Sequence, residues 1–310
     1  MPELPEVETT KTSLKPLLGA KLNTIHLHCT QLRWAVPQDL HALKNHYLVH
    51  IDRRAKYLIL YFHPNKAYQH NNTSSHDQDA LEKRLIIHLG MSGSLQQYPQ
   101  HTQKRKHDHV IMQFIDTQNV PRQLHYHDPR RFGAILWYDE YADKLLSSLA
   151  VEPLTTEFNA KYLYALIHPQ STQIQSTHNK KREVSRPIKS VIMDQKFVVG
   201  VGNIYATESL FLSGIHPLIP ANQLTLAQLQ ILVDNIKTIL KNAIQQGGST
   251  LKDFTVSSGQ TGYFQQTLHI YGKHNQSCPK CSNLIDKVTI TGRASTFCST
   301  CQPYPTTDSL

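Results

Sequence analysis

The sequence predicts an α+β fold made of an N-terminal antiparallel β-sandwich that begins with a helix, a C-terminal helical domain, and a four-cysteine zinc finger. Residues 21–150 contain many short segments in which apolar and polar residues alternate, with no long helix between them. After residue 152 the apolar spacing becomes that of helices. Two Cys-x2-Cys pairs stand near the C-terminus. We therefore expect domains at residues 1–150, 151–270 and 271–310.

The composition favours a basic protein that binds a polyanion. The 310 residues carry 32 Lys plus Arg against 23 Asp plus Glu, a formal net charge of +9. Such an excess favours nucleic acid, because binding releases its counterions. Hydrophobic residues make up 39% of the chain, and no apolar run approaches the roughly 18 residues of a membrane helix. The first twenty residues carry three glutamates and no apolar stretch, so we expect no signal peptide and a soluble, intracellular protein.

The first six residues, MPELPE, suit amine chemistry. If the initiator methionine is removed, Pro2 presents a secondary amine, and α-amino groups with a pKa of about 7.7–8 are partly uncharged and nucleophilic near neutral pH. Glu3 and Glu6 would share one face of the helix that we expect over residues 3–18, where they could move protons. The alternative is an ordinary helix start, since proline and glutamate are common in a first turn.

Seven short strands are expected between residues 21 and 138. Each is rich in Ile, Leu, Val or Tyr, and several alternate in period two. Polar turns separate them, and the low-complexity segment His70–Asp79 is expected to be a surface loop. The expected strands are Leu22–His28, Tyr47–Ile51, Tyr57–His63, Arg84–Leu89, Val110–Ile115, Gln123–His127 and Ala134–Tyr138.

Three segments of this half carry candidate functional residues. Arg53–Lys56 is a basic cluster that runs into a strand, and it could be either an edge-strand charge cluster or a phosphate or catalytic contact. In His88–Gly93 two glycines define a turn that would hold Met91 outward, which is unusual because methionine is normally buried. In His127–Gly133 two arginines precede Phe132 in a loop bounded by proline and glycine. Exposed arginine and aromatic side chains suit insertion into a base stack, although each residue alone is more often part of a core.

The second half is expected to be helical. Val199–Asn203 places two glycines and an amide donor before a helix, which suits a phosphate; it is not a dinucleotide fingerprint, because no third glycine follows. Two helices joined by a short turn have a helix-turn-helix shape. Residues 169–186 are expected to be a linker or flexible loop, and 253–274 a loop that either covers a pocket or links domains. The expected helices are Phe158–Ile167, Pro187–Met193, Asn203–Leu212 and 225–246.

The most specific motif consists of two CxxC pairs separated by sixteen residues: Cys278, Cys281, Cys298 and Cys301. This separation is typical of four-cysteine zinc sites, and four protein ligands leave no open position, so the metal would be structural. Disulfides are the alternative, which the lack of a secretion signal disfavours. Between the pairs we expect a hairpin with Arg293 at its tip, placed to enter a groove or bind a phosphate.

Taken together, these segments resemble the bacterial formamidopyrimidine-DNA glycosylases, the bifunctional 8-oxoguanine glycosylases and abasic-site lyases of the helix–two-turn–helix superfamily. The resemblance extends over essentially the whole chain, and the combination is specific although no single segment is. Residues 69–82, 171–181 and Gln302–Leu310 depart from the usual pattern. The resemblance rests on Pro2–Thr9, Arg53–Leu58, His88–Leu95, Asp128–Gly133, Val199–Tyr205, Gly247–Phe254, and Gly292-Arg293 between the CxxC pairs.

The resemblance implies base excision repair by a Schiff-base mechanism. Pro2 would attack C1′ of the damaged nucleotide and expel an oxidised purine, and β- and then δ-elimination would leave a one-nucleotide gap. Glu3 would protonate or stabilise the opening sugar, Glu6 would assist in the same pocket, and Lys56 would contact the lesion strand. The nucleophile needs no cofactor, so one structural Zn2+ is the cofactor implied.

The resemblance also implies a partner and a set of DNA contacts. The partner would be damaged double-stranded DNA with 8-oxoguanine opposite cytosine, and the enzyme would be a monomer of the bacterial cytoplasm, associated with the nucleoid. Residues 253–274 would contain the segment that closes over the everted base. Two alternatives are an endonuclease VIII-like glycosylase for oxidised pyrimidines and a non-catalytic zinc-ribbon DNA-binding protein. Phosphates would be held by His88, Asn203 and Arg293, and the void left by the everted base would be filled by Met91, Arg130 and Phe132.

Overall fold

The computed structural model describes residues 2–68, 70, 81–169, 182–248 and 268–305. The chain divides into two compact units: residues 1–147 with 244–265 form the first, and 148–243 with 266–310 form the second. The loops expected at His70–Asp79 and 253–274 lie largely outside the described residues. Within the described part of the chain, no helix is long and apolar enough to span a bilayer.

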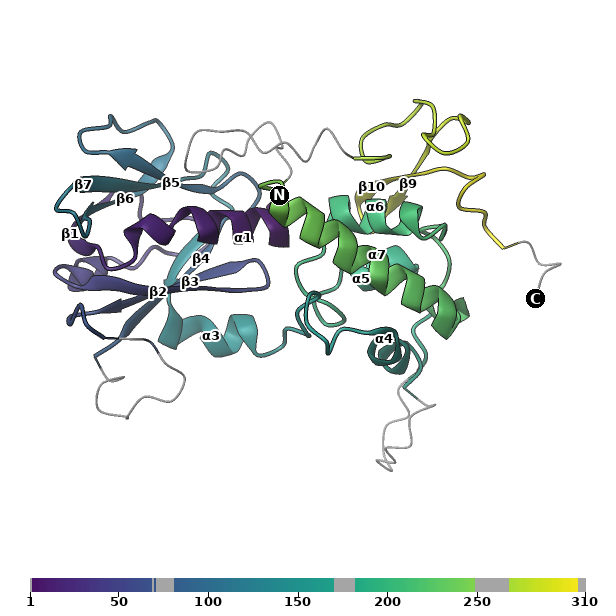
Figure 1. Ribbon diagram of the computed structural model, residues 1–310, viewed down its shortest axis with the longest axis horizontal. Helices are drawn as coiled ribbons and strands as arrows, with labels where there is room; N and C mark the ends of the chain where they lie inside the picture. Colours follow the sequence, from purple (N-terminus) through teal and green to yellow (C-terminus); the bar gives the residue numbers. More distant parts are fainter. Residues whose placement is uncertain (1, 69, 71–80, 170–181, 249–267, 306–310) are drawn as a thin grey trace. The chain divides into compact units, whose positions relative to one another are not determined.

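The first unit contains helices α1 (Leu4–Ser13) and α3 (Tyr138–Leu146), the short turns η1 (Lys15–Leu17) and η2 (Leu40–Leu43), and strands β1 (Lys21–Leu27), β2 (Tyr47–Arg54), β3 (Tyr57–His63), β4 (Lys83–His88), β5 (Ser94–Pro99), β6 (Asp108–Ile115), β7 (Pro121–His127) and β8 (Ala134–Trp137). The strands form one antiparallel sheet in the order β5-β7-β6-β1-β2-β3-β4-β8 (Figure 1). β1 and β2 share a single pair, Lys21 with Tyr47, so the sheet divides there into two four-stranded halves.

The core of the first unit gathers apolar side chains from both halves of the sheet and from α1. Alternate residues of β3, Leu58, Leu60 and Phe62, are fully buried in it, as the period-two pattern predicts. Val7 of α1 belongs to the same cluster, and α1 contacts β2, β3 and β5 (Figure 1). Burial of each such side chain contributes roughly 1.5–3 kcal/mol.

All seven expected strands are present, and the structure adds β5 and α3. The sequence of β5, SLQQYP, is too polar to be recognised as a strand, yet Gln96 is buried and accepts a hydrogen bond of 3.1 Å from Arg105 Nη1. Helix α3 contacts β4 and β8 but buries no residue completely, and it follows β8 without a break, so the sequence gives no separate start signal for it. The first helix ends at Ser13 instead of residue 18, because Pro16 has no N–H to continue the helical ladder.

The second unit contains α4 (Ala160–Ile167), α5 (Ile188–Ile192), α6 (Asn203–Leu212), η3 (Ala221–Gln223), most of α7 (Leu226–Gln245), and a hairpin of β9 (Asp286–Ile290) and β10 (Arg293–Phe297). The four expected helices and the expected hairpin are therefore present. Thr225 caps the start of α7, since its Oγ1 accepts a hydrogen bond of 3.2 Å from the Gln228 amide.

The hairpin packs on α6 (Figure 1). The chain that leads into it is held by Glu208, a fully buried residue of α6. The Glu208 carboxylate accepts hydrogen bonds from the amides of His269, Ile270 and Tyr271 at 2.8, 2.9 and 2.7 Å. Hydrogen bonds to an ionised acceptor are stronger than neutral ones, so Glu208 fixes this segment to α6.

Candidate active site and nucleic-acid interface

The N-terminal residues lie at the start of α1. Pro2 is buried, and Glu3 and Glu6 expose only 2% and 1% of their surface. The Glu3 amide donates a hydrogen bond of 2.8 Å to Glu6 Oε2, so the first turn is capped by its own carboxylate. Gly248, with φ +81°, comes close to this carboxylate, since a Cβ built on it would lie 3.4 Å from Glu6 Oε1. Both predicted acids are thus buried in the turn that Pro2 begins.

The basic cluster Arg53–Lys56 spans the turn between β2 and β3. Arg53 Nε forms a 2.5 Å ion pair with Glu8 Oε2 of α1, and Arg53 Nη1 donates to the Ala55 carbonyl at 2.9 Å. Arg53 therefore ties this turn to α1. Lys56 is buried, and its charge acts on His88 of the neighbouring strand.

His88 ends β4, opposite Tyr57 of β3, and the two ring centroids are 5.0 Å apart. The Gly90 amide donates a hydrogen bond of 3.1 Å to His88 Nδ1. Burial lowers the pKa of His88 to about 4, and the charges of Lys56 and Arg33 act in the same direction. The neutral ring therefore carries its proton on Nε2, which remains an uncharged donor at neutral pH.

Two loops of the first unit, His88–Gly93 and Asp128–Gly133, are in direct backbone contact, and we refer to them as the paired loops. A Cβ built on Gly90 would lie 2.5 Å from Gly133 N. One built on Gly133 would lie 1.8 Å from Tyr126 Oη and 2.5 Å from the His88 carbonyl oxygen. Tyr126 Oη donates to that carbonyl at 3.1 Å. Neither glycine has room for a side chain, so the backbones are locked together.

Asp128 joins the paired loops. Its side chain is fully buried, Oδ1 accepts from Ser92 Oγ at 2.9 Å, and Oδ2 accepts from the Gly133 amide at 2.8 Å. Neither Asp128 nor Ser92 is among the functional residues predicted from the sequence. An aspartate followed by proline at the start of a loop is a turn-capping signal that could have identified Asp128.

The predicted void-filling residues lie at the exposed tips of the paired loops. Met91 exposes 38% of its surface and Phe132 46%, which is unusual for large apolar side chains. The guanidinium carbon of Arg130 lies 5.1 Å from the centroid of the Phe132 ring. The structure therefore brings these three residues to neighbouring, exposed positions, which confirms that they are not core residues.

Two predicted phosphate-binding residues are neighbours in the second unit. Asn203 begins α6, and its Nδ2 donates a hydrogen bond of 3.1 Å to the carbonyl of Ala294. Ala294 follows Arg293, whose side chain is exposed at the turn of the hairpin. The contact places Asn203 against the hairpin backbone, one residue from Arg293.

A buried lysine lies behind this pair and was not singled out from the sequence. Lys189 of α5 exposes 1% of its surface, and its Nζ donates to Thr207 Oγ1 and Ser295 Oγ, both at 2.7 Å. Thr207 Oγ1 in turn donates to the Asn203 carbonyl at 2.7 Å. Lys189 therefore links α5, α6 and β10 where Asn203 meets the hairpin.

The four cysteines of the C-terminal pairs form one cluster. Their sulfur atoms all lie within 4.8 Å of one another, and none is in a disulfide. Cys278 Sγ is 3.8 Å from Cys301 Sγ, and Cys281 Sγ is 3.5 Å from Cys298 Sγ. Tetrahedral zinc with Zn–S distances of about 2.3 Å would separate its sulfurs by about 3.8 Å. The cluster could hold a metal ion.

Comparison with known proteins decides the family. Residues 1–135 match the formamidopyrimidine-DNA glycosylase N-terminal domain, and residues 149–255 match the H2TH domain of the same enzymes. The chain belongs to the formamidopyrimidine-DNA glycosylase family. Membership confirms the predicted fold class and the predicted enzyme class, a DNA glycosylase of base excision repair with abasic-site lyase activity. The alternative of a non-catalytic zinc-ribbon protein is thereby disfavoured.

Relatives of the family resemble the chain over its whole length. The formamidopyrimidine-DNA glycosylase of Psychrobacter arcticus is 54% identical over 98% of this chain and 99% of its own, and that of Acinetobacter baumannii is 45% identical over 98% and 97%. Lactococcus lactis Fpg, solved with DNA containing an abasic site, is 31% identical with a TM-score of 0.77, covering 97% of this chain and 100% of its own. A MutM protein solved with DNA containing carbocyclic 8-oxo-G is 32% identical with a TM-score of 0.78, covering 98% and 100%.

Proposed function

We propose that the chain, once Met1 is removed, excises oxidised purines from double-stranded DNA through a covalent intermediate on Pro2. The observation that carries the proposal is the buried first turn of α1, where Glu3 and Glu6 adjoin the residue that would become the N-terminus. The Pro2 nitrogen attacks C1′, the bond from C1′ to the base nitrogen breaks, and the base leaves with a proton.

The two carboxylates support different steps. Glu3 protonates the ring oxygen as the sugar opens, and Glu6, anchored on the Glu3 amide, assists in the same pocket. A secondary amine yields an iminium cation, which acidifies the C2′ protons. Loss of a C2′ proton expels the 3′-phosphate by β-elimination, and a second elimination expels the 5′-phosphate, so a one-nucleotide gap remains.

Residues outside the first turn bind the DNA. Lys56 contacts the lesion strand, and the neutral Nε2–H of His88 donates to a phosphate. Asn203 and Arg293 bind phosphate from the second unit, where the Asn203 contact to β10 supports a shared role. A basic net charge of +9 favours each of these contacts.

The paired loops evict the damaged base. Met91, Arg130 and Phe132 fill the void that the everted base leaves, and their exposure at two locked loops supports this role. Unstacking a base costs a few kcal/mol, which an inserted side chain offsets by stacking in its place. The substrate would be 8-oxoguanine opposite cytosine, acted on by a monomer in the bacterial cytoplasm at the nucleoid.

Cys278, Cys281, Cys298 and Cys301 would hold one Zn2+. Four thiolates complete a tetrahedral site, so the ion would have no open position and would stabilise the hairpin that carries Arg293. The sulfur separations within the cluster support this assignment.

Borohydride trapping on an 8-oxoguanine:cytosine duplex tests the proposal. The reductant delivers hydride to the iminium carbon and gives a stable tertiary amine, so the wild-type protein should be recovered as a covalent DNA adduct. Pro2→Gln should give no adduct, because its large second residue retains Met1 and leaves no amine at position 2. Pro5→Ala, a change to the neighbouring proline of the same turn, should keep the adduct.

Two results would contradict the proposal. An adduct of wild-type yield in Pro2→Gln would place the nucleophile elsewhere, and an intact mass that retains Met1 in the active protein would exclude Pro2. Stronger trapping on thymine glycol than on 8-oxoguanine would instead support the endonuclease VIII-like alternative.

A further inference from the structure

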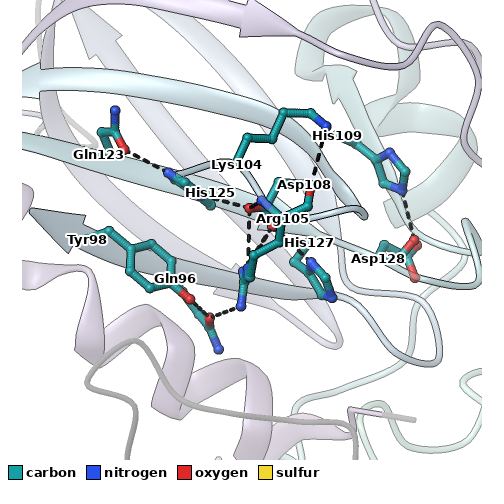
Figure 2. A network of polar contacts seen from close by, with 10 residues as sticks. All are labelled: Gln96, Tyr98, Lys104, Arg105, Asp108, His109, Gln123, His125, His127 and Asp128. Carbon is teal, nitrogen blue, oxygen red and sulfur yellow. Dashed lines mark hydrogen bonds and ion pairs between the residues drawn. The ribbon is translucent and has the colours of Figure 1, made fainter. Parts of the chain in front are cut away.

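A buried polar network lies at the base of the paired loops. Asp108 begins β6, and three side chains converge on its carboxylate (Figure 2). His125 Nδ1 lies 2.9 Å from Oδ2, and His127 Nδ1 lies 2.9 Å from Oδ1. Arg105 Nη2 donates to Oδ1 at 3.0 Å, and the Arg105 amide donates to Oδ2 at 2.8 Å.

The groups of this network are paired mainly with one another. Burial alone would raise the pKa of Asp108, but the hydrogen bonds from His125, His127 and Arg105 outweigh it and lower that pKa far below its usual range. The second nitrogen of His125, Nε2, is 3.0 Å from Gln123 Oε1. Asp108 is therefore an ionised acceptor, and its loss would leave the fully buried His125 Nδ1 and the partly buried His127 and Arg105 without their partner.

The same segment also binds Asp128 directly. The Asp128 amide donates to the His107 carbonyl at 3.0 Å, and His109 Nε2 donates to the Asp128 carbonyl at 2.9 Å (Figure 2). His127, which Asp108 holds, immediately precedes Asp128. His107, Asp108 and His109 thus each hold the end of β7, where the chain enters the loop Asp128–Gly133.

We propose that Asp108 is a positioning residue for base eversion. Through His127 and the flanking contacts to Asp128, it fixes the backbone position from which the loop carrying Arg130 and Phe132 projects. This inference rests on the proposed void-filling role of that tip. Asp108 touches neither substrate nor the reacting atoms, so its effect should appear in removal of a stacked base and should be absent from later steps.

The test compares excision of 8-oxoguanine from a duplex with strand cleavage at a preformed abasic site, each under single-turnover conditions. Asp108→Asn should slow excision about tenfold, as expected from the loss of a buried charged acceptor, and leave abasic-site cleavage within about twofold. A fluorescent base analogue beside the lesion should unstack correspondingly more slowly.

Asp116→Asn is the matched control. Asp116 lies at the opposite end of the β6–β7 hairpin, where it accepts from the Gln118 and Val120 amides and from Arg122 Nε. It should lower stability without slowing eversion. His127→Asn, whose amide nitrogen can replace Nδ1, should preserve the excision rate, whereas His127→Leu should resemble Asp108→Asn.

Phe132→Ala separates this inference from the proposed function. In the Phe132→Ala background, Asp108→Asn should have no further effect on excision, because the residue through which it acts is gone. An equal slowing in that background, or in Asp116→Asn, would overturn the positioning role. If Phe132→Ala itself leaves duplex excision unchanged, the void-filling function fails, and this inference fails with it.

Discussion

Gly133→Ala should disrupt the close backbone contact between the paired loops. The added methyl group would lie 1.8 Å from Tyr126 Oη and 2.5 Å from the His88 carbonyl oxygen. Tyr126 cannot swing away because it is buried, and the second contact is to backbone. The hydrogen bond between these two groups, 3.1 Å long, would also be lost.

The expected loss of stability follows from these contacts. Overpacking in a dense interior costs roughly 1–3 kcal/mol, and one buried hydrogen bond contributes about 1 kcal/mol. We therefore expect the free energy of unfolding to fall by about 2–4 kcal/mol, a large part of the roughly 5–15 kcal/mol typical of a folded protein. Excision should fall in parallel, since Phe132 adjoins Gly133.

Urea denaturation followed by tryptophan fluorescence measures this loss, because Trp137 packs against the core of the first unit. Tyr126→Phe removes the atom nearest to the new methyl group, so the double variant should recover about 1 kcal/mol of the loss. Gly272→Asn is the control, since nothing lies within 4 Å of a Cβ built there. A Gly133→Ala protein as stable as the wild type would refute the close approach of the two loops.

Three further outcomes are expected. The pKa of His88 lies near 4, below its ordinary value of 6.5, so the unfolded chain binds the proton first and the melting temperature should fall as the pH drops from about 6.5 to 4. The lowered pKa of Asp108 adds a loss of stability at still lower pH. His88→Gln should weaken the pH dependence of the melting temperature between pH 6.5 and 4 and leave that at lower pH unchanged. Cys298→Ser should lose bound metal by mass spectrometry and weaken DNA binding, whereas Cys29→Ser, outside the cluster, should keep one ion. Glu208→Gln should cost about 2 kcal/mol and speed amide exchange at residues 269–271.

Periodicity was sufficient for most of the fold because most elements bury one face. β3 is a short run of Leu, Ile, Tyr and Phe, and α7 carries an apolar stripe, so both are predicted from the sequence. β5 and α3 are not, because their stability comes from polar and tertiary contacts. Gln96 looks like a solvent-facing residue until Arg105 is placed beside it.

The site residues also differ in whether sequence pattern or tertiary contacts reveal them. Met91 and Phe132 were accessible to prediction because glycine and proline mark the loops that expose them. Asp108 was not, since its partners lie 17 and 19 residues away on another strand, and a histidine on an alternating strand gives no sign that it is buried. Contacts of this kind exist only once strand pairing is known.

In the proposed void-filling role of Phe132, the close contact between the paired loops would also bear on how the enzyme searches DNA. Gly90 packs against the backbone of Phe132 and Gly133, so the loop that carries Phe132 would not shift toward Gly90 when the tip meets a base pair. The strain of each encounter then falls on the DNA, whose local deformability depends on sequence and damage. In that role, intact, well-stacked pairs would resist and be passed quickly, whereas a weakened pair would yield. A stiff loop would thus convert differences in DNA flexibility into differences in dwell time before any atom of the lesion is read.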